Sequence, residues 1–161
     1  MTLTASSEAP AFPLTGDFLA GRLRQNLSLD DLKYIEGLVD TVAEYGDTAR
    51  LLARGTKTDR STILIEGYIF RTIESAGKRF ITGIHVPGDF VDLHGFALKR
   101  LDHNIDAAGR VTVGSVSHDT LRKVMRDRPG VARAMWFATL LDASIHRKWI
   151  QMLEQLDAPR R

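Results

Sequence analysis

The chain has 161 residues, 43% of them hydrophobic and 26% charged, which is typical of a globular protein that forms one compact domain. The absence of cysteine excludes thiolate catalysis, iron–sulfur clusters and a disulfide framework. The net charge of +2 is too small to indicate nucleic-acid binding by itself.

The N-terminal part is expected to form an irregular arm followed by two short helices. Residues 1–15 contain Pro10 and Pro13 and show no periodicity, so we assign them to the arm. Apolar residues then recur at helical spacing in two groups: Phe18, Leu19 and Leu23, and Leu29, Leu32, Ile35, Leu38 and Val39. Ser28 is placed to cap the second helix.

Between residues 45 and 117 the pattern changes to short β-prone runs separated by turn residues. The runs are 49–52, 61–73, 79–86, the neighbourhood of Val91, 105–107 and 111–116. Turn signals occur at Gly55, Ala76-Gly77, Pro87-Gly88 and Gly109. Because no helical segment separates these runs, they predict an antiparallel β-sandwich or barrel.

Helical periodicity returns after Val116. Ser117 can cap a short helix that ends near Arg128, and Pro129 suits the first turn of a much longer one, which we expect over residues 129–158. Apolar residues on the long helix follow a coiled-coil-like spacing: Val131, Met135, Ala138, Ile145, Trp149, Met152 and Leu156, with Asp142 as the polar member. We expect this seam to join two copies in a homodimer. The alternative is that a single chain buries all the apolar residues of this helix within its own fold.

This order of elements resembles the effector domain of the Crp/Fnr family of bacterial transcription regulators. The stretch HVPGDFVDLHGF (residues 85–96) resembles the family's Pro-Gly-Asp-Phe turn and ligand-binding loop. The stretch SIHRKWIQMLEQLDAPRR (residues 144–161) is similar to the end of its dimerisation helix. The resemblance implies a mainly β protein, with an antiparallel β-roll of the jelly-roll, cyclic-nucleotide-binding type over residues 16–128, followed by the dimerisation helix.

The resemblance also implies a ligand-binding loop, but several of its positions differ from those of cyclic-AMP-binding members. The loop positions are Gly88, Asp89, Phe90, Val91, Asp92, Leu93, His94, Gly95, Lys99, Arg100, Ile105 and Asp106. Asp92 and Leu93 stand where those members have glycine and glutamate, and Ile105 and Asp106 stand where they have arginine and a hydroxyl residue. Carboxylates near a phosphate site repel the ligand. We therefore do not expect ordinary cyclic AMP binding. The loop indicates a degenerate pocket, an effector of another type, or no effector.

The five histidines form no metal signature in the sequence. A cupin-like metalloenzyme would be the rival interpretation, but that fold carries an H-x-H pair, which the chain lacks. His85 and His94 are the pair that the turn could bring together, and they are also the candidate ligands if the domain resembles the family's haem sensors. We predict no metal site. No catalytic motif is recognisable, so no enzyme activity is expected.

In complete members of this family the long helix leads into a helix-turn-helix domain. No such pattern follows here, so we expect no specific DNA binding by this chain. The leading hypothesis is an effector-sensing, dimerising domain of a Crp/Fnr-type regulator. The alternative is a stand-alone protein that forms heterodimers with full-length regulators. No signal peptide or membrane-spanning run is present, which indicates a cytoplasmic protein without a membrane partner.

Overall fold

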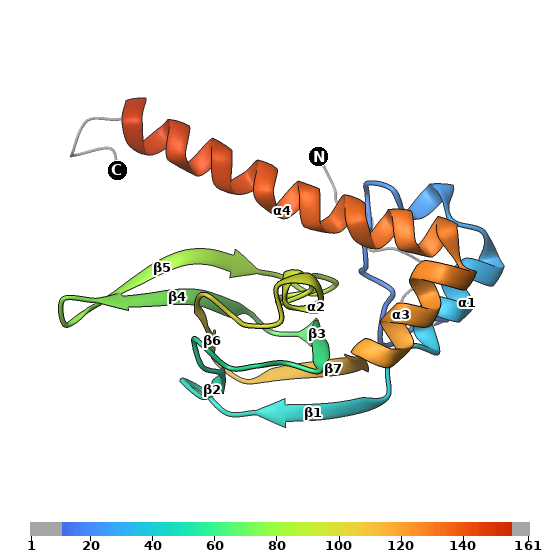
Figure 1. Cartoon of the computed structure of the whole chain (residues 1–161), viewed down its shortest axis with the longest axis horizontal. Coiled ribbons are helices and arrows are strands. Elements are labelled where there is room, and N and C mark those ends of the chain that lie inside the picture. The colour runs from blue at the N-terminus through green and yellow to red at the C-terminus, as the bar shows by residue number, and fades with distance from the viewer. Residues whose placement is uncertain (1–10, 156–161) are drawn as a thin grey trace.

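A computed structural model describes residues 11–155 of the protein (Figure 1). Residues 11–27 form consecutive turns that include a 3-10 helix, η1 (Arg24–Asn26), instead of the first predicted helix. Left-handed backbone at Leu19 (φ 55°) and Gly21 (φ 69°) prevents a continuous helix there. The carboxylate of Glu36 anchors this segment, because it accepts hydrogen bonds from the backbone N–H groups of Leu14 and Thr15.

The second predicted helix is present as α1 (Leu29–Glu36). The hydroxyl of Ser28 accepts a hydrogen bond from the backbone N–H of Asp31, 3.1 Å away, and so caps the helix as expected. Leu32 and Ile35 are buried on its inner face. This local agreement reflects a capping signal that lies entirely within a few consecutive residues.

Within residues 11–155, seven strands form two antiparallel sheets. The strands are β1 (Thr41–Tyr45), β2 (Arg50–Leu52), β3 (Arg60–Glu66), β4 (Ile69–Ser75), β5 (Lys78–His85), β6 (Asn104–Ala107) and β7 (Val111–Ser117). One sheet has the order β1-β7-β3 and the other β2-β6-β4-β5. Gly67, with φ +88°, divides the predicted run 61–73 into β3 and β4. Val91 belongs to no strand, although its neighbour Phe90 makes an isolated bridge to Ile63.

Three helices complete the fold: α2 (His94–Leu98), α3 (His118–Asp127) and α4 (Pro129–Gln155). Figure 1 shows α4 extending over β4 and β5, with α3 and α1 beside its first turns. The predicted antiparallel β-roll with a long C-terminal helix is confirmed. Along residues 11–155, no helix combines the length and the apolar character needed to cross a bilayer.

The hydrophobic core has two parts. One lies inside the roll and includes Leu64 and Ile105, while the other joins α1, α3 and the start of α4 to the roll. Val131 and Met135, which the sequence placed in the dimer seam, are fully buried in this second part. Because their side chains already pack within the chain, a partner cannot use them. Leu156, the last seam position, lies outside the described residues.

Candidate functional site between the roll and the long helix

The turn that opens the predicted ligand-binding loop lies against the N-terminal segment. Gly88 has φ +90°, and a Cβ atom at this position would lie 2.2 Å from the carbonyl oxygen of Asp17. Asp89 accepts a hydrogen bond from the backbone N–H of Val86 at 3.1 Å, and its carboxylate lies 3.5 Å from Nδ1 of His85. Glycine is therefore required at residue 88 for two reasons: the backbone there is left-handed, and a Cβ atom would collide with the backbone of Asp17.

Asp92 holds the following segment against β3. Its carboxylate accepts hydrogen bonds from the backbone N–H of Thr62 at 2.6 Å and from the Thr62 hydroxyl at 3.3 Å. Burial raises the pKa of Asp92 to about 7, although these hydrogen bonds oppose the shift. Val91 and Leu93, on either side, are buried apolar residues. This part of the predicted loop therefore has a packing role.

The basic residues of the predicted loop bond to nearby carbonyl groups. Lys99 donates to the carbonyl oxygen of Phe96, and Arg100 donates to that of Gly55 at 2.9 Å. Gly95 packs closely against Thr58, whose Oγ1 would lie 3.1 Å from an added Cβ atom. The predicted loop thus commits both of its basic side chains to backbone carbonyl groups.

The two β6 positions of the predicted site are also occupied by protein contacts. Ile105 is fully buried, and Asp106 forms ion pairs with Arg50 at 2.8 Å and Arg79 at 3.1 Å. Burial opposes ionisation of Asp106, but hydrogen bonds from Arg50 and Thr72 lower its pKa. The Asp106 carboxylate is therefore buried and paired with two arginines within the protein.

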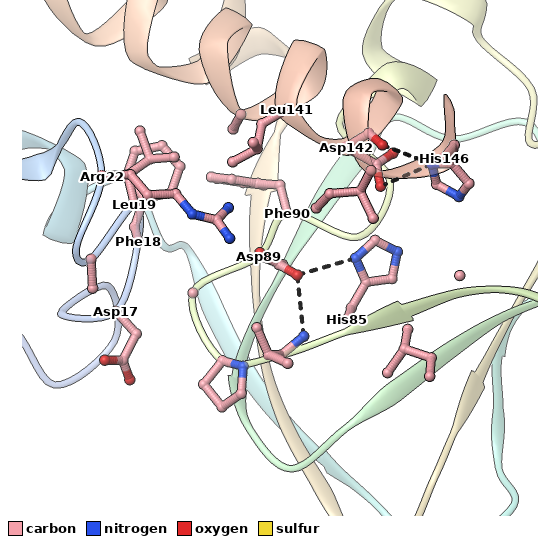
Figure 2. Close-up of a pocket in the computed structure, with 18 of the residues that line it drawn as sticks. Asp17, Phe18, Leu19, Arg22, His85, Asp89, Phe90, Leu141, Asp142 and His146 are labelled. Atoms are coloured by element: carbon pink, nitrogen blue, oxygen red, sulfur yellow. Dashed lines mark hydrogen bonds and ion pairs between the residues drawn. The ribbon is translucent and has the colours of Figure 1, made fainter. Parts of the chain in front are cut away.

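A cavity of about 400 Å³ opens beside the turn (Figure 2). Its walls come from the N-terminal segment (residues 17–20 and 22), the end of β5 with the following turn (residues 83–90), and the middle of α4. The α4 wall is formed by Ala138, Leu141, Asp142, Ile145, His146 and Trp149. The cavity therefore combines apolar walls with ionisable groups, as small-molecule sites commonly do.

Arg71 connects the sheet to α4 next to this cavity. Its side chain is largely buried, and Nη1 donates to a carboxylate oxygen of Asp142 at 3.0 Å while Nη2 donates to the carbonyl oxygen of Val91 at 3.3 Å. On the next turn of α4, His146 Nε2 lies 2.8 Å from the carbonyl oxygen of Thr82 on β5. Two polar contacts therefore hold the helix to the sheet.

A second polar cluster lies within the roll, where His94 and His103 have ring centroids 5.0 Å apart. Burial and the charge of Arg71 lower the pKa of His94, and burial lowers that of His103 to about 4. Asp102 Oδ1 lies 2.5 Å from Nδ1 of His103. The sequence interpretation, which considered His85 and His94 as a pair, did not identify this cluster.

The structure resembles known regulators and binding domains at low sequence identity. CLP, a c-di-GMP responsive global regulator of Xanthomonas campestris, matches with a TM-score of 0.69, 13% identity and coverage of 81% of this chain and 66% of its own. A cyclic nucleotide-binding domain from Methylobacillus flagellatus matches with a TM-score of 0.68 and 14% identity, over 87% and 78% of the two chains.

The N-terminal domain of a transcriptional regulator from Streptomyces coelicolor matches with a TM-score of 0.62 and 18% identity, over 87% of this chain and 96% of that one. These three proteins are regulators or binding domains. No protein-family model and no curated protein matches the sequence. The chain therefore shares the fold of these regulators and cyclic nucleotide-binding domains, which is the fold that the resemblance implied.

Proposed function

We propose that this chain is the effector-sensing and dimerising domain of a Crp/Fnr-type transcription regulator. The observation that carries the proposal is the contact of Arg71 on β4 with Asp142 on α4, next to a cavity whose walls include both the roll and α4. A small molecule that fills this cavity touches both parts. It can shift the position of the helix only if it binds one arrangement better than the other.

The proposed effector is not recognised through the usual phosphate contacts of a cyclic nucleotide. In support, Lys99 and Arg100 bond to backbone carbonyl groups, and Asp106 stands on β6 where a phosphate-binding residue would be needed. The cavity instead offers Arg22 and His85 among apolar side chains such as Trp149. These features suit a ligand with both an apolar body and polar groups.

Trp149 provides a direct test, because it lines the cavity while the other tryptophan, Trp136, is exposed. The variant Trp136→Phe leaves Trp149 as the single tryptophan reporter. We expect its emission to show no saturable change with cyclic AMP or cyclic GMP, with titration calorimetry giving the same result. Micromolar binding of either nucleotide would contradict this part of the proposal, and cyclic di-GMP should be tested in parallel.

Dimerisation is proposed to use the exposed apolar face of α4. Trp136, Leu140 and Ile150 are more than half exposed, although they are large apolar residues of the same helix. At about 100° per residue these three side chains lie on one side of α4. An exposed apolar surface of this kind is typical of an interface. Because Val131 and Met135 are buried within the chain, this proposed face differs from the first part of the predicted seam.

Leu140→Glu is expected to convert a dimer into a monomer, because it places a charge within the proposed interface. Light scattering at micromolar concentration measures the mass of both forms. Leu98→Glu is the matched control, since Leu98 is an exposed leucine on α2 and its substitution should leave the mass unchanged. A monomeric wild-type chain, or a dimer that survives Leu140→Glu, would show that this face is not the interface.

A further inference from the structure

Two histidines with unused ring nitrogens meet inside the roll. His94 begins α2, and His103 immediately precedes β6. The Nε2 atoms of both rings are buried, and neither has a hydrogen-bond partner within residues 11–155. A buried ring nitrogen without a partner is unfavourable, and a ligand would remove that cost. Because the two rings lie close together, with centroids 5.0 Å apart, one ligand could bind both of them.

Asp102 adds a carboxylate to this pair. Ring nitrogens of His94 and His103 and a carboxylate oxygen of Asp102 all lie within 4.8 Å of one another. Tetrahedral zinc with bonds of about 2.0–2.1 Å places its ligand atoms about 3.3 Å apart, a spacing that rotations of these side chains can approach. The Asp102 carboxylate lies against His103 Nδ1, and rotation of this exposed side chain would bring it toward an ion bound by the ring.

The local charges are compatible with a cation. The carboxylate of Asp102 brings a negative charge next to the two imidazoles, which bind metal in their neutral form. The positive charge of Arg71 opposes a cation, but its guanidinium is paired with Asp142. The carboxylate of Asp102 is largely exposed and provides an entry side from solvent.

We propose that His94, His103 and Asp102 form a binding site for a divalent transition metal ion with the ligand preference of Zn²⁺. Two imidazoles and one carboxylate are a donor set that suits zinc and its neighbours rather than Mg²⁺ or Ca²⁺, and solvent completes the coordination. The ion joins the start of α2 to the segment that enters β6. This inference does not rest on the proposed function, because metal binding is measured without any effector.

The test uses the full chain without an affinity tag, treated with a chelator and then titrated with Zn²⁺ by calorimetry. We expect one ion per chain, and a loss of affinity of about tenfold or more in His94→Gln, in His103→Gln and in Asp102→Asn. His118→Gln is the matched control, since His118 is as buried as His103 but its Nε2 lies 3.2 Å from the Ser61 hydroxyl. It should bind Zn²⁺ like the wild type, with circular dichroism to verify folding.

A second measurement does not depend on variants that fold. In NMR spectra of the wild-type chain, Zn²⁺ should shift the ring resonances of His94 and His103 and leave that of His118 in place. Absence of binding by the wild type would overturn the proposal. So would unchanged affinity in the folded His94→Gln and His103→Gln variants, or Zn²⁺-induced shifts confined to the other histidines.

Discussion

Gly88→Ala is expected to destabilise the domain by about 3 kcal/mol or more, because it combines a left-handed backbone with a backbone collision. The new methyl carbon would lie 2.2 Å from the carbonyl oxygen of Asp17 and 2.8 Å from the amide nitrogen of Phe18. Neither is the flexible end of a side chain. The N-terminal segment must therefore move away from the turn, which removes one wall of the cavity.

The variant Gly77→Ala separates the cost of the left-handed backbone from the cost of the collision. Gly77 has φ +72° at the tip of the β4–β5 hairpin, and an added Cβ atom would meet nothing within 4 Å. We expect it to lose only about 1 kcal/mol, the cost of the backbone conformation. Urea unfolding measures both losses, and limited proteolysis reports release of residues 17–22 in Gly88→Ala. Equal losses in the two variants would show that the contact with Asp17 does not contribute.

Arg71→Met is expected to lower the free energy of unfolding by about 2 kcal/mol, because it leaves the Val91 carbonyl oxygen and the Asp142 carboxylate without this donor. The expected loss is below that of a fully buried pair, since the Asp142 side chain is one-third exposed and keeps part of its hydration. Urea unfolding measures the effect. The fluorescence of Trp149 should also change, because the cavity wall is no longer held to the sheet.

A double-mutant cycle tests whether the contact itself is responsible. If Arg71 and Asp142 stabilise one another, Arg71→Met combined with Asp142→Asn loses less stability than the two single losses added together. Arg79→Met is the control, since Arg79 is about half exposed and its partner Asp106 retains Arg50. That substitution should cost less than about 1 kcal/mol. Strict additivity in the cycle would contradict the proposed coupling of sheet and helix.

The sequence predicts local features of this fold well. Ser28 and Ser117 both cap helices as their positions indicate, because a cap depends on residues three positions apart. The predicted first helix was wrong, since left-handed residues at 19 and 21 interrupt it and long-range bonds to Glu36 hold the segment instead. β1 was missed because all of its residues are exposed, so hydrophobic alternation gives no signal.

The candidate site could be predicted only in part. The turn at Gly88 was identified from the sequence. The contacts of the residues around it could not be predicted, because they depend on which strands pair. Arg71 could have been identified from the sequence, because it lies two residues after Ile69 and therefore on the same, core-facing side of the strand. A charged residue at such a position needs a partner. That the partner is Asp142 on α4 could not be predicted. His94 and His103 likewise meet because α2 folds back toward β6, a contact that their sequence spacing does not indicate.

The helix α4 is long and is buried mainly near one end, so a small rotation about that end displaces the other end further. Its 27 residues extend for about 40 Å, and its buried residues lie near one end, at Val131, Ala134 and Met135. If the helix pivots about this buried end, distances are measured from Val131. Asp142 then lies about 16 Å along the helix axis and Gln155 about 36 Å. A displacement of the helix at Asp142 is therefore roughly doubled at Gln155.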